Sequence, residues 1–375
     1  MTQPPRDVVI VGAGIVGAAC ADALSREGVS VTVIESRGVS ADATAAGMGH
    51  LVVMDDSEAQ FALTRYSVEL WSRLAPQAPQ EVEFDPSGTL WVAADEEEMD
   101  AVRKKQRFYS ERGVATEILD ARQVLEAEPN LRVGLAGGLR VPGDCVLYPP
   151  VAAQWLLDRA RQRGAKLIHG EVVSLKPNTV HLRDGTRVSA AFVVNAAGIL
   201  SPRLADGIDV RPRKGHLLIT DRYPGFLHHQ IIELGYLKSA HATSSDSVAF
   251  NVQPRKTGQI LIGSSRQYGS EDPAIEHPIL RRMIHRAVEY MPGLAKLSVV
   301  RAWAGFRPST PDKLPLIGPS PADPTHILAT GHEGLGITTS LATARLVTDH
   351  LLGRPSSIPA DPYLPGRFAK EAAHG

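Results

Sequence analysis

The hydrophobic pattern near the start of the chain predicts two strands separated by a helix. Val8–Val11 is an unbroken apolar run, typical of a short, fully buried strand. Residues 18–26 are good helix formers, and Gly28 can end that helix in a left-handed conformation. β-branched residues alternate through Val29–Ile34 and predict the second strand. This order is typical of the unit from which parallel sheets are built.

The same order of elements returns later in the chain. Pro150–Gly170 predicts an amphipathic helix that stops at Gly164 and leads into a strand. A hairpin with an Asp-Gly turn at 184–185 follows. Phe192–Gly198 is again a buried strand ending in small residues, and Thr325–Gly353 repeats strand, glycine-rich turn and helix.

Three glycines follow the first strand in the spacing G-x-G-x-x-G, at Gly12, Gly14 and Gly17. The first permits a tight turn, the second lets the backbone approach a pyrophosphate, and the third lets helix and strand pack closely. The helix N-terminus offers free N–H groups to phosphates. Glu35, at the end of the second strand, suits both hydroxyls of an adenosine ribose and disfavours a 2′-phosphate. The motif predicts dinucleotide binding without separating NAD from FAD.

The chain is therefore predicted to be an α/β protein of two interleaved domains, which its 375 residues allow. A discontinuous Rossmann-like domain takes residues 1–47, 144–214 and 301–375. Residues 48–143 and 215–300 mix helical patterns with alternating strands, and we expect them to form an inserted α+β domain on an antiparallel sheet. A nicotinamide dehydrogenase usually has one contiguous cofactor domain, so the interleaving favours a flavoprotein.

A candidate for substrate binding lies in the stretch Arg301–Pro308. As a strand it alternates, with Trp303, Gly305 and Arg307 on one face. Pro308 holds Arg307 extended. An arginine at a strand end beside a glycine suits bidentate capture of a carboxylate. The alternative is a surface arginine paired with Asp312. We expect Arg301 to be structural.

Composition excludes several classes of function. Hydrophobic content is 43% and charged content 22%, as in ordinary globular proteins, and the net charge of −1 gives no field toward nucleic acid. The basic residues at 103–107 follow an acidic run and predict one solvated helix. Cys20 and Cys145 are the only cysteines, which indicates a reducing compartment. There is no metal-ligand spacing, P-loop or nucleophile elbow.

The chain is expected to be cytoplasmic. Its first strand begins by Val8, which leaves no room for a targeting segment. No stretch approaches the about 18 uninterrupted apolar residues of a membrane span. Peripheral membrane association, heteromeric assembly and homo-oligomerisation stay open.

Five motifs in order make the chain resemble the D-amino-acid oxidase family of FAD enzymes, near glycine oxidase, the third subunit of hydrogen cyanide synthase and D-hydroxyproline dehydrogenases. They are the N-terminal fingerprint, "ATAAGMGH" at 43–50, "VVNAAG" at 193–198, "WAGFRPSTPDKLPLIG" at 303–318 and "GHEGLGIT" at 331–338. The resemblance covers almost the whole chain and implies a glutathione-reductase-like FAD-binding domain.

The resemblance also implies which residues hold FAD. The small residues at 43–48 contact the diphosphate and the flavin ring, a valine at 172 pairs its backbone with adenine, and the 331–338 turn points its N–H groups at the pyrimidine side of the ring. The expected cofactor-binding residues are Gly12, Ala13, Gly14, Ile15, Val16, Gly17, Glu35, Ser36, Arg37, Thr44, Ala45, Ala46, Gly47, Met48, Val172, Ala197, Gly198, Arg307, Gly331, Gly334, Leu335, Gly336, Ile337 and Thr338.

The substrate site implied by the resemblance centres on Arg307, the family's carboxylate-binding arginine. His50 falls where glycine oxidase has a glycine, and Asn251 replaces a family tyrosine that contacts substrate. His50 either bonds the substrate or fills space, and His332 either lines the pocket or caps the turn. The weaker candidates are Tyr236 and Tyr268.

The implied function is FAD-dependent oxidation of an amino or imino acid, with hydride transfer from Cα to flavin N5. No protein base is needed if the amine binds unprotonated. A D-configured cyclic imino acid such as cis-4-hydroxy-D-proline is the favoured substrate. The alternatives are a glycine or sarcosine oxidase, the FAD subunit of a heteromeric dehydrogenase and, in another class, an NAD-binding dehydrogenase or a non-catalytic nucleotide-binding subunit. The electron acceptor is oxygen, a quinone or a partner protein.

Overall fold

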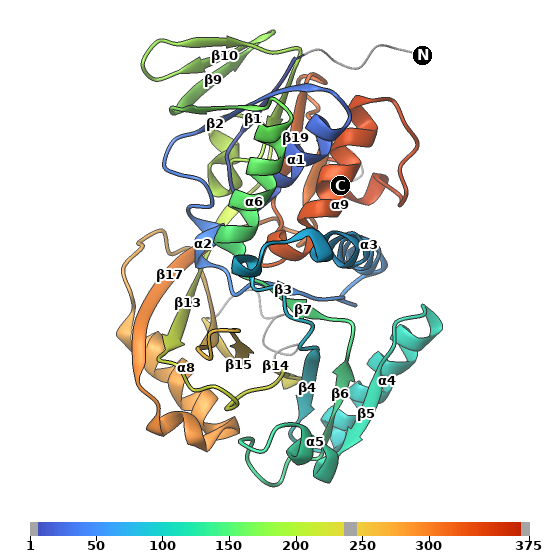
Figure 1. Ribbon diagram of the computed structural model, residues 1–375, viewed down its shortest axis with the longest axis vertical. Helices are drawn as coiled ribbons and strands as arrows, with labels where there is room; N and C mark the ends of the chain where they lie inside the picture. The colour runs from blue at the N-terminus through green and yellow to red at the C-terminus, as the bar shows by residue number, and fades with distance from the viewer. Residues whose placement is uncertain (1–6, 236–245, 369–375) are drawn as a thin grey trace.

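The computed structural model describes residues 7–235 and 246–368. Its two main sheets lie in separate halves of the molecule, one at the top of Figure 1 and one at the bottom. The upper sheet has six strands in the order β18-β19-β12-β1-β2-β8. These strands are β1 (Asp7–Val11), β2 (Ser30–Glu35), β8 (Lys166–His169), β12 (Phe192–Asn195), β18 (Leu316–Pro319) and β19 (His326–Thr330).

The upper sheet is parallel except for β18, which pairs antiparallel with β19. Parallel neighbours need crossover connections, and helices α1 (Ile15–Arg26), α6 (Pro149–Gln162) and α9 (Gly336–Leu351) lie against this sheet. Helix α1 packs against both α6 and α9. Within the described residues, no helix combines the length and apolarity needed to cross a membrane.

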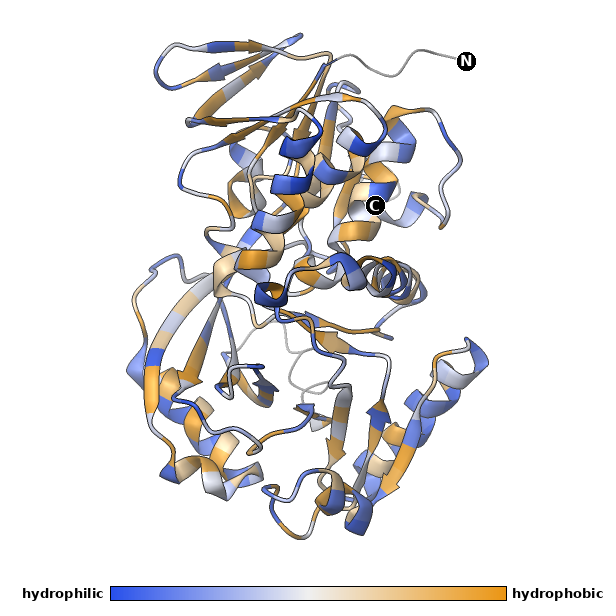
Figure 2. Ribbon diagram, in the orientation of Figure 1, coloured by the Kyte–Doolittle hydropathy of each residue, from blue (hydrophilic) through white to orange (hydrophobic). Residues whose placement is uncertain are grey.

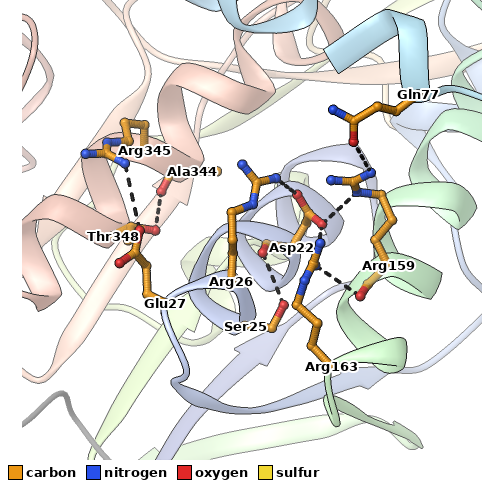
Figure 3. Close-up of polar contacts among 10 residues, drawn as sticks. All are labelled: Asp22, Ser25, Arg26, Glu27, Gln77, Arg159, Arg163, Ala344, Arg345 and Thr348. Atoms are coloured by element: carbon orange, nitrogen blue, oxygen red, sulfur yellow. Dashed lines mark hydrogen bonds and ion pairs between the residues drawn. The ribbon is translucent and has the colours of Figure 1, made fainter. Parts of the chain in front are cut away.

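Charged side chains join these three helices. Asp22 of α1 is buried and accepts hydrogen bonds from Arg159 Nε of α6 at 3.0 Å and from Nη1 of Arg163, the residue after α6, at 2.8 Å (Figure 3). On the side of α9, Arg345 lies 4.0 Å from Glu27. A buried carboxylate is tolerated only when it is paired, so the Asp22 contacts fix α1 against α6.

The lower sheet has eight strands in the order β17-β13-β16-β15-β14-β4-β6-β5. All its pairings are antiparallel except that of β4 with β14. The strands are β4 (Thr89–Ala93), β5 (Glu117–Asp120), β6 (Gly137–Val141), β13 (Arg211–Thr220), β14 (Gln230–Glu233), β15 (Ser247–Pro254), β16 (Ile260–Tyr268) and β17 (Val299–Ser309). Helix α8 (His277–Tyr290) packs on β15 and β16.

Smaller elements complete the two halves. Strands β9, β10 and β11 form the predicted hairpin sheet at the top of Figure 1. Their bounds are Val172–Lys176, Thr179–Leu182 and Arg187–Ser189. The other elements are α2 (Ala43–Ala46), β3 (His50–Leu51), α3 (Glu58–Leu74), α4 (Glu96–Glu111), α5 (Ala121–Ala127) and β7 (Cys145–Val146).

The predicted division of the chain is wrong at two places. Residues 301–309, assigned to the cofactor-binding domain, belong to β17 and pair with β13 in the lower sheet. Helix α3, assigned to the inserted domain, packs on α9 of the upper half. Both errors have one cause, because local hydrophobic patterns reveal the type of an element but not the element on which it packs.

The solvated helix predicted around residues 103–107 is α4, but one of its lysines is buried. Lys105 Nζ binds the carboxylate of Asp55 and lies 4.3 Å from the centre of the Trp91 ring. The Lys105 side chain is only 3% exposed. A buried ammonium needs such partners, and they come from distant segments that the local charge pattern does not reveal.

Candidate active site

The glycines of the first turn are required by close contacts. Gly12 has φ +103°, and a Cβ there would lie 2.7 Å from the Ala196 oxygen. A Cβ at Gly17 would lie 2.0 Å from the Gly12 oxygen. Gly14 caps α1 in extended conformation, and a Cβ there would meet only the Thr44 hydroxyl, at 3.1 Å. The turn is therefore tight on its inner side and open at Gly14, as a phosphate cradle requires.

Glu35 reaches back to this turn. Ala13 N donates to Glu35 Oε2 at 2.8 Å, and Arg37 N donates to Oε1 at 2.8 Å. Gly38 N also donates to Oε1, at 3.4 Å. Each carboxylate oxygen accepts up to two hydrogen bonds, so Oε2 has capacity left for one more donor. The carboxylate is half-buried. It is thus fixed by the backbone and retains an acceptor position on Oε2, which a ribose hydroxyl would use.

The small-residue segment at 43–48 lies between the two halves. The Thr44 hydroxyl accepts from Ile15 N at 3.0 Å, which ties the segment to the start of α1. On its other side, Trp303 Nε1 donates to the Ala46 oxygen at 3.3 Å. A Cβ added at Gly305 would lie 2.3 Å from Ala46 Cβ, so this contact admits no larger residue. Trp303 and Gly305 share one face of β17, as their alternation predicts.

Arg307 leaves the same face of β17 and crosses the neighbouring strand. A Cβ at Gly215 of β13 would lie 2.4 Å from Arg307 Nη1, so the guanidinium rests on a bare backbone. Nη1 donates to the Ser265 oxygen of β16 at 3.1 Å. The alternative pairing with Asp312 is wrong, because Arg367 binds both oxygens of that carboxylate, at 2.7 and 2.9 Å.

The loop between β19 and α9 covers Arg307. Glu333 N donates to the Pro308 oxygen at 2.8 Å. A Cβ at Gly334 would lie 3.5 Å from Arg307 Cδ and Nε. Burial lowers the pKa of Arg307, and the nearby carboxylate of Glu333 opposes that change. The charged guanidinium is therefore held between sheet and loop, where water competes little for its hydrogen bonds.

His50 joins this group from the strand β3. The Thr338 hydroxyl of α9 donates to the His50 oxygen at 2.8 Å. Burial lowers the pKa of His50 to about 4, with smaller effects from the Gly334 backbone and the charge of Arg307. His50 Nδ1 is buried and has no hydrogen-bond partner among the described residues. At neutral pH this imidazole is uncharged and has a free nitrogen.

Asn251 and Gln253 lie on one face of β15, as predicted. Gln253 Nε2 donates to the Met48 oxygen at 2.7 Å. Asn251 pairs with Gly263 of β16, where a Cβ would lie 3.3 Å from Met48 Sδ. The side-chain oxygens of both Asn251 and Gln253 are buried without a partner within the described chain. This face therefore presents free acceptors beside the segment that ends at Met48.

Other predicted residues lie at the carboxyl ends of the upper strands. Ala197 N donates to Asn195 Oδ1 at 3.2 Å, and the Gly198 oxygen accepts from the Thr330 hydroxyl at 3.0 Å. Val172 begins β9. Ligands of open α/β sheets bind at the carboxyl ends of the strands, the edge at which the Gly12 turn also lies.

His332 is packed against helix α9. It is buried, and its Nε2 lies 2.9 Å from the Thr343 hydroxyl of α9. Burial lowers the pKa of His332 to about 3. Its two predicted roles, lining the pocket and capping the turn, stay predictions. Tyr236 lies outside the described residues.

Sequence reasoning missed Arg213, Glu333 and the use of Tyr268. Arg213 pairs directly with Arg307 across β13 and β17. Its Nη1 donates to Glu333, and its guanidinium lies 4.5 Å from the centre of the Tyr268 ring. One signal was present in the sequence, because Arg213 lies two residues from Gly215 as Arg307 lies two residues from Gly305.

Comparison with known families decides the identity of this site. The DAO family, described as FAD dependent oxidoreductase, matches residues 7–350. The chain belongs to this family. It is accordingly a DAO-family oxidoreductase that uses FAD and acts on amino or imino acids.

Named relatives match this DAO-family chain over nearly its whole length. Hydrogen cyanide synthase subunit HcnC of Pseudomonas aeruginosa is 29% identical, over 98% of this chain and 97% of the relative. Glycine oxidase of Geobacillus kaustophilus is 28% identical, over 95% of this chain and 96% of the relative. The crystal structure of that glycine oxidase superposes with a TM-score of 0.87, over 97% of this chain and 99% of the other, at 25% identity. The resemblance inferred from the motifs is thereby confirmed.

The residues present fit FAD. The Gly14 cradle suits a diphosphate, Glu35 retains an acceptor position on Oε2, and the contact of Ala46 with Gly305 admits no larger side chain. When bound, FAD supplies the redox chemistry by accepting a hydride from the substrate. The individual cofactor contacts predicted from the sequence stay predictions.

Proposed function

We propose that this DAO-family enzyme oxidises an amino or imino acid whose carboxylate is held by Arg307. We further propose a D-configured cyclic imino acid, such as cis-4-hydroxy-D-proline, as the substrate. The observation that carries the first proposal is the guanidinium of Arg307, which rests on Gly215 under the Gly334 loop. A partly desolvated arginine fork binds a carboxylate through two parallel hydrogen bonds.

Arg307 would orient the substrate as well as bind it. Two parallel bonds fix both the position and the rotation of a carboxylate, and therefore the direction of its Cα–H bond. The contact of Nη1 with the Ser265 oxygen uses one N–H of the five on the guanidinium. The remaining donors leave capacity for a carboxylate.

His50 supports a substrate larger than glycine. Its imidazole stands close to Arg307 and Gly334, which is the place of a glycine in the family pattern. Because its pKa of about 4 keeps it neutral at pH 7, it adds no charge beside the substrate. Its free Nδ1 can bond a polar substituent or the ring nitrogen of an imino acid.

Glycine is the second candidate substrate. Relatives at 28% identity bear the name glycine oxidase, and that similarity covers 95–96% of this chain. His50 argues against it, because glycine carries no side-chain group that the free Nδ1 could bond. A glycine-specific site would also have little use for the free acceptors of Asn251 and Gln253.

The electron acceptor and the assembly are two further proposals. One relative is named as a subunit of hydrogen cyanide synthase, so a heteromeric complex is a candidate for this chain as well. In such a complex, electrons would pass to a partner protein rather than to oxygen. Oxygen consumption by the isolated chain, compared with reduction of a dye, separates the two cases.

Anaerobic reduction of the bound flavin tests the proposed function. The holoenzyme is expected to be yellow, absorbing near ~450 nm, and to bleach on mixing with cyclic D-imino acids. The panel should hold D- and L-proline, cis-4-hydroxy-D-proline, glycine, sarcosine and an amine without a carboxylate. If glycine reduces the flavin fastest, glycine replaces the cyclic imino acid as the proposed substrate. Equal reduction by the amine without a carboxylate would refute the role of Arg307.

A further inference from the structure

A second arginine lies beside Arg307. Arg213 lies directly opposite Arg307 in the pairing of β13 with β17, so both side chains leave the same face of the sheet. The Arg213 side chain is only 3% exposed, pairs with Glu333 and stacks on Tyr268. We call Arg213, Glu333 and Tyr268 the open cluster.

Three buried polar atoms of the open cluster have no hydrogen-bond partner among the described residues. They are Nε and Nη2 of Arg213 and Oε2 of Glu333. Buried polar groups in native proteins are nearly always paired, and an unpaired one destabilises the fold. The cluster therefore presents two donor atoms and one acceptor atom that a bound group would satisfy.

A second cluster of an arginine, a glutamate and a tyrosine differs from the open cluster, because its arginine and glutamate satisfy each other. Arg255 Nε and Nη2 donate to the two oxygens of Glu83, at 2.7 and 2.5 Å. The Arg255 guanidinium lies 4.0 Å from the centre of the Tyr148 ring. We call Arg255, Glu83 and Tyr148 the closed cluster, because both carboxylate oxygens are bound.

The free atoms of the open cluster match one chemical group by count. A hydroxyl accepts two hydrogen bonds and donates one. A second carboxylate could only accept and would face the negative charge of Glu333. An ammonium could only donate and would face the positive charge of Arg213. Because the free atoms are both donors and an acceptor, the subsite suits an uncharged group that both accepts and donates.

We propose that Arg213 and Glu333 form a subsite for a hydroxyl group carried by the substrate. The hydroxyl would accept from Arg213 and donate to Glu333 Oε2 while Arg307 holds the carboxylate. The inference rests on the proposed function and deepens it, since it assigns the residues that select a hydroxylated acid. Glu333 N donates to the Pro308 oxygen, so the hydroxyl-binding carboxylate is tied to the residue that follows Arg307.

The test compares two substrates that differ by the hydroxyl alone. Anaerobic flavin reduction is measured for cis-4-hydroxy-D-proline and D-proline with the wild-type holoenzyme. A site built to bond a hydroxyl rejects the analogue that lacks it, so we expect kcat/KM to favour the hydroxylated ring by about 100-fold or more. The ratio of the two values is insensitive to partial loss of folded enzyme, because both are measured on one preparation.

A double variant tests the two residues, and the closed cluster provides a matched control. In Arg213→Met/Glu333→Gly, both charges are removed together, and glycine suits the left-handed backbone of Glu333, which has φ +52°. The ratio should fall to within about threefold of one, while D-proline is still oxidised. Arg255→Met/Glu83→Gly makes the same changes at a glutamate with the same φ of +52° and should leave the ratio unchanged.

Several outcomes would overturn the inference. Equal use of the two rings by the wild type would mean that water satisfies the open cluster. An unchanged ratio in the Arg213→Met/Glu333→Gly variant would place the hydroxyl elsewhere, and a stronger preference for a side-chain carboxamide would replace the hydroxyl as the ligand. Oxidation of D-proline with no preference for the hydroxylated ring refutes the hydroxyl subsite but not the proposed function. If no cyclic imino acid reduces the flavin, the proposed function fails first.

Discussion

The open and closed clusters use the same three residue types for different ends. In the closed cluster, two nitrogens of one arginine bind both oxygens of one glutamate. In the open cluster, a single nitrogen forms the pair, and three polar atoms stay free among the described residues. Residue composition therefore does not identify a binding site. The degree to which buried polar groups are already satisfied does.

The two clusters also differ in where they lie in the fold. The closed cluster joins the residue after β15, the residue after η2 (Gln80–Val82) and the residue before α6, and its charged atoms satisfy each other. The open cluster lies at the end of β13 opposite Arg307, where Gly215 and Gly305 leave the backbone bare. Satisfied polar groups stabilise the fold, whereas a binding site leaves some polar groups unsatisfied until the substrate binds.

The largest expected effect comes from removing the guanidinium of Arg307. Arg307→Ala should lower kcat/KM by at least ~3 kcal/mol, more than about 100-fold, because both binding and orientation of the carboxylate are lost. Arg307→Lys should lower the rate of reduction at saturating substrate and raise KM, since an ammonium cannot form the fork. FAD should stay bound in both variants.

Anaerobic stopped-flow reduction measures the Arg307 effect, and Arg255→Ala is its control from the closed cluster. The control should change stability rather than rate. Reduction of Arg307→Ala at the wild-type rate would show that the carboxylate binds elsewhere, and Arg213 would then be the next candidate.

The second prediction concerns an acid that is only partly satisfied. Glu35 binds three backbone N–H groups and has capacity for one more donor. Glu35→Ala should raise the dissociation constant of FAD about 10- to 150-fold, since charge-assisted bonds of roughly 1.5–3 kcal/mol are lost. Flavin retained after long dialysis at low concentration measures this. Full retention would contradict the role.

The third prediction addresses the closed cluster itself. Glu83→Gln should lower the free energy of unfolding by roughly 1–3 kcal/mol, because it leaves a largely buried guanidinium with one weaker partner. Flavin reduction in the folded fraction should stay at the wild-type rate. Denaturant unfolding gives the first quantity and stopped-flow the second. A variant with unchanged stability and a slowed reaction would reverse the assignment of the two clusters.

The smallest effect is expected from pH at His50. Its folded pKa of about 4 is below the ordinary value near 6.5, so the unfolded chain binds a proton first. Stability contributed by neutral His50 is therefore complete above about pH 6.5 and is lost as the pH falls toward 4. His50→Gly should flatten the pH dependence of unfolding in this window.

The same variant tests the substrate role of His50. His50→Gly should leave the flavin spectrum nearly unchanged and shift preference from cyclic imino acids to smaller amines. The wild-type pH profile of kcat/KM should show no ionisation of His50 near neutral pH. An unchanged set of substrates would place His50 outside the substrate space.

Features encoded in local sequence could be predicted. The β1–α1–β2 unit, its glycines and Glu35 lie within one short segment, and the structure has the close packing expected at Gly17. The face of β17 that carries Arg307 followed from simple alternation. These predictions needed no knowledge of distant partners.

Features that depend on distant pairing could not be predicted. Arg213 and Glu333 are 120 residues apart in sequence, and neither segment alone signals the contact. Lys105 was expected in solvent because its partner Asp55 lies 50 residues away. The domain boundary at 301 was wrong for the same reason, since β17 is assigned by its pairing with β13 rather than by its own pattern.

The arrangement of the upper sheet also fixes when the site can exist during synthesis. The glycine turn after β1 leaves the ribosome early, but β19, the loop over Arg307 and α9 are made last. At about 5–20 residues per second, roughly 15 to 65 s separate the two. During that interval the nascent chain contains the glycine turn but not the loop that covers Arg307. The FAD contacts predicted at both the turn and the 331–338 loop can therefore form together only after that loop has been made.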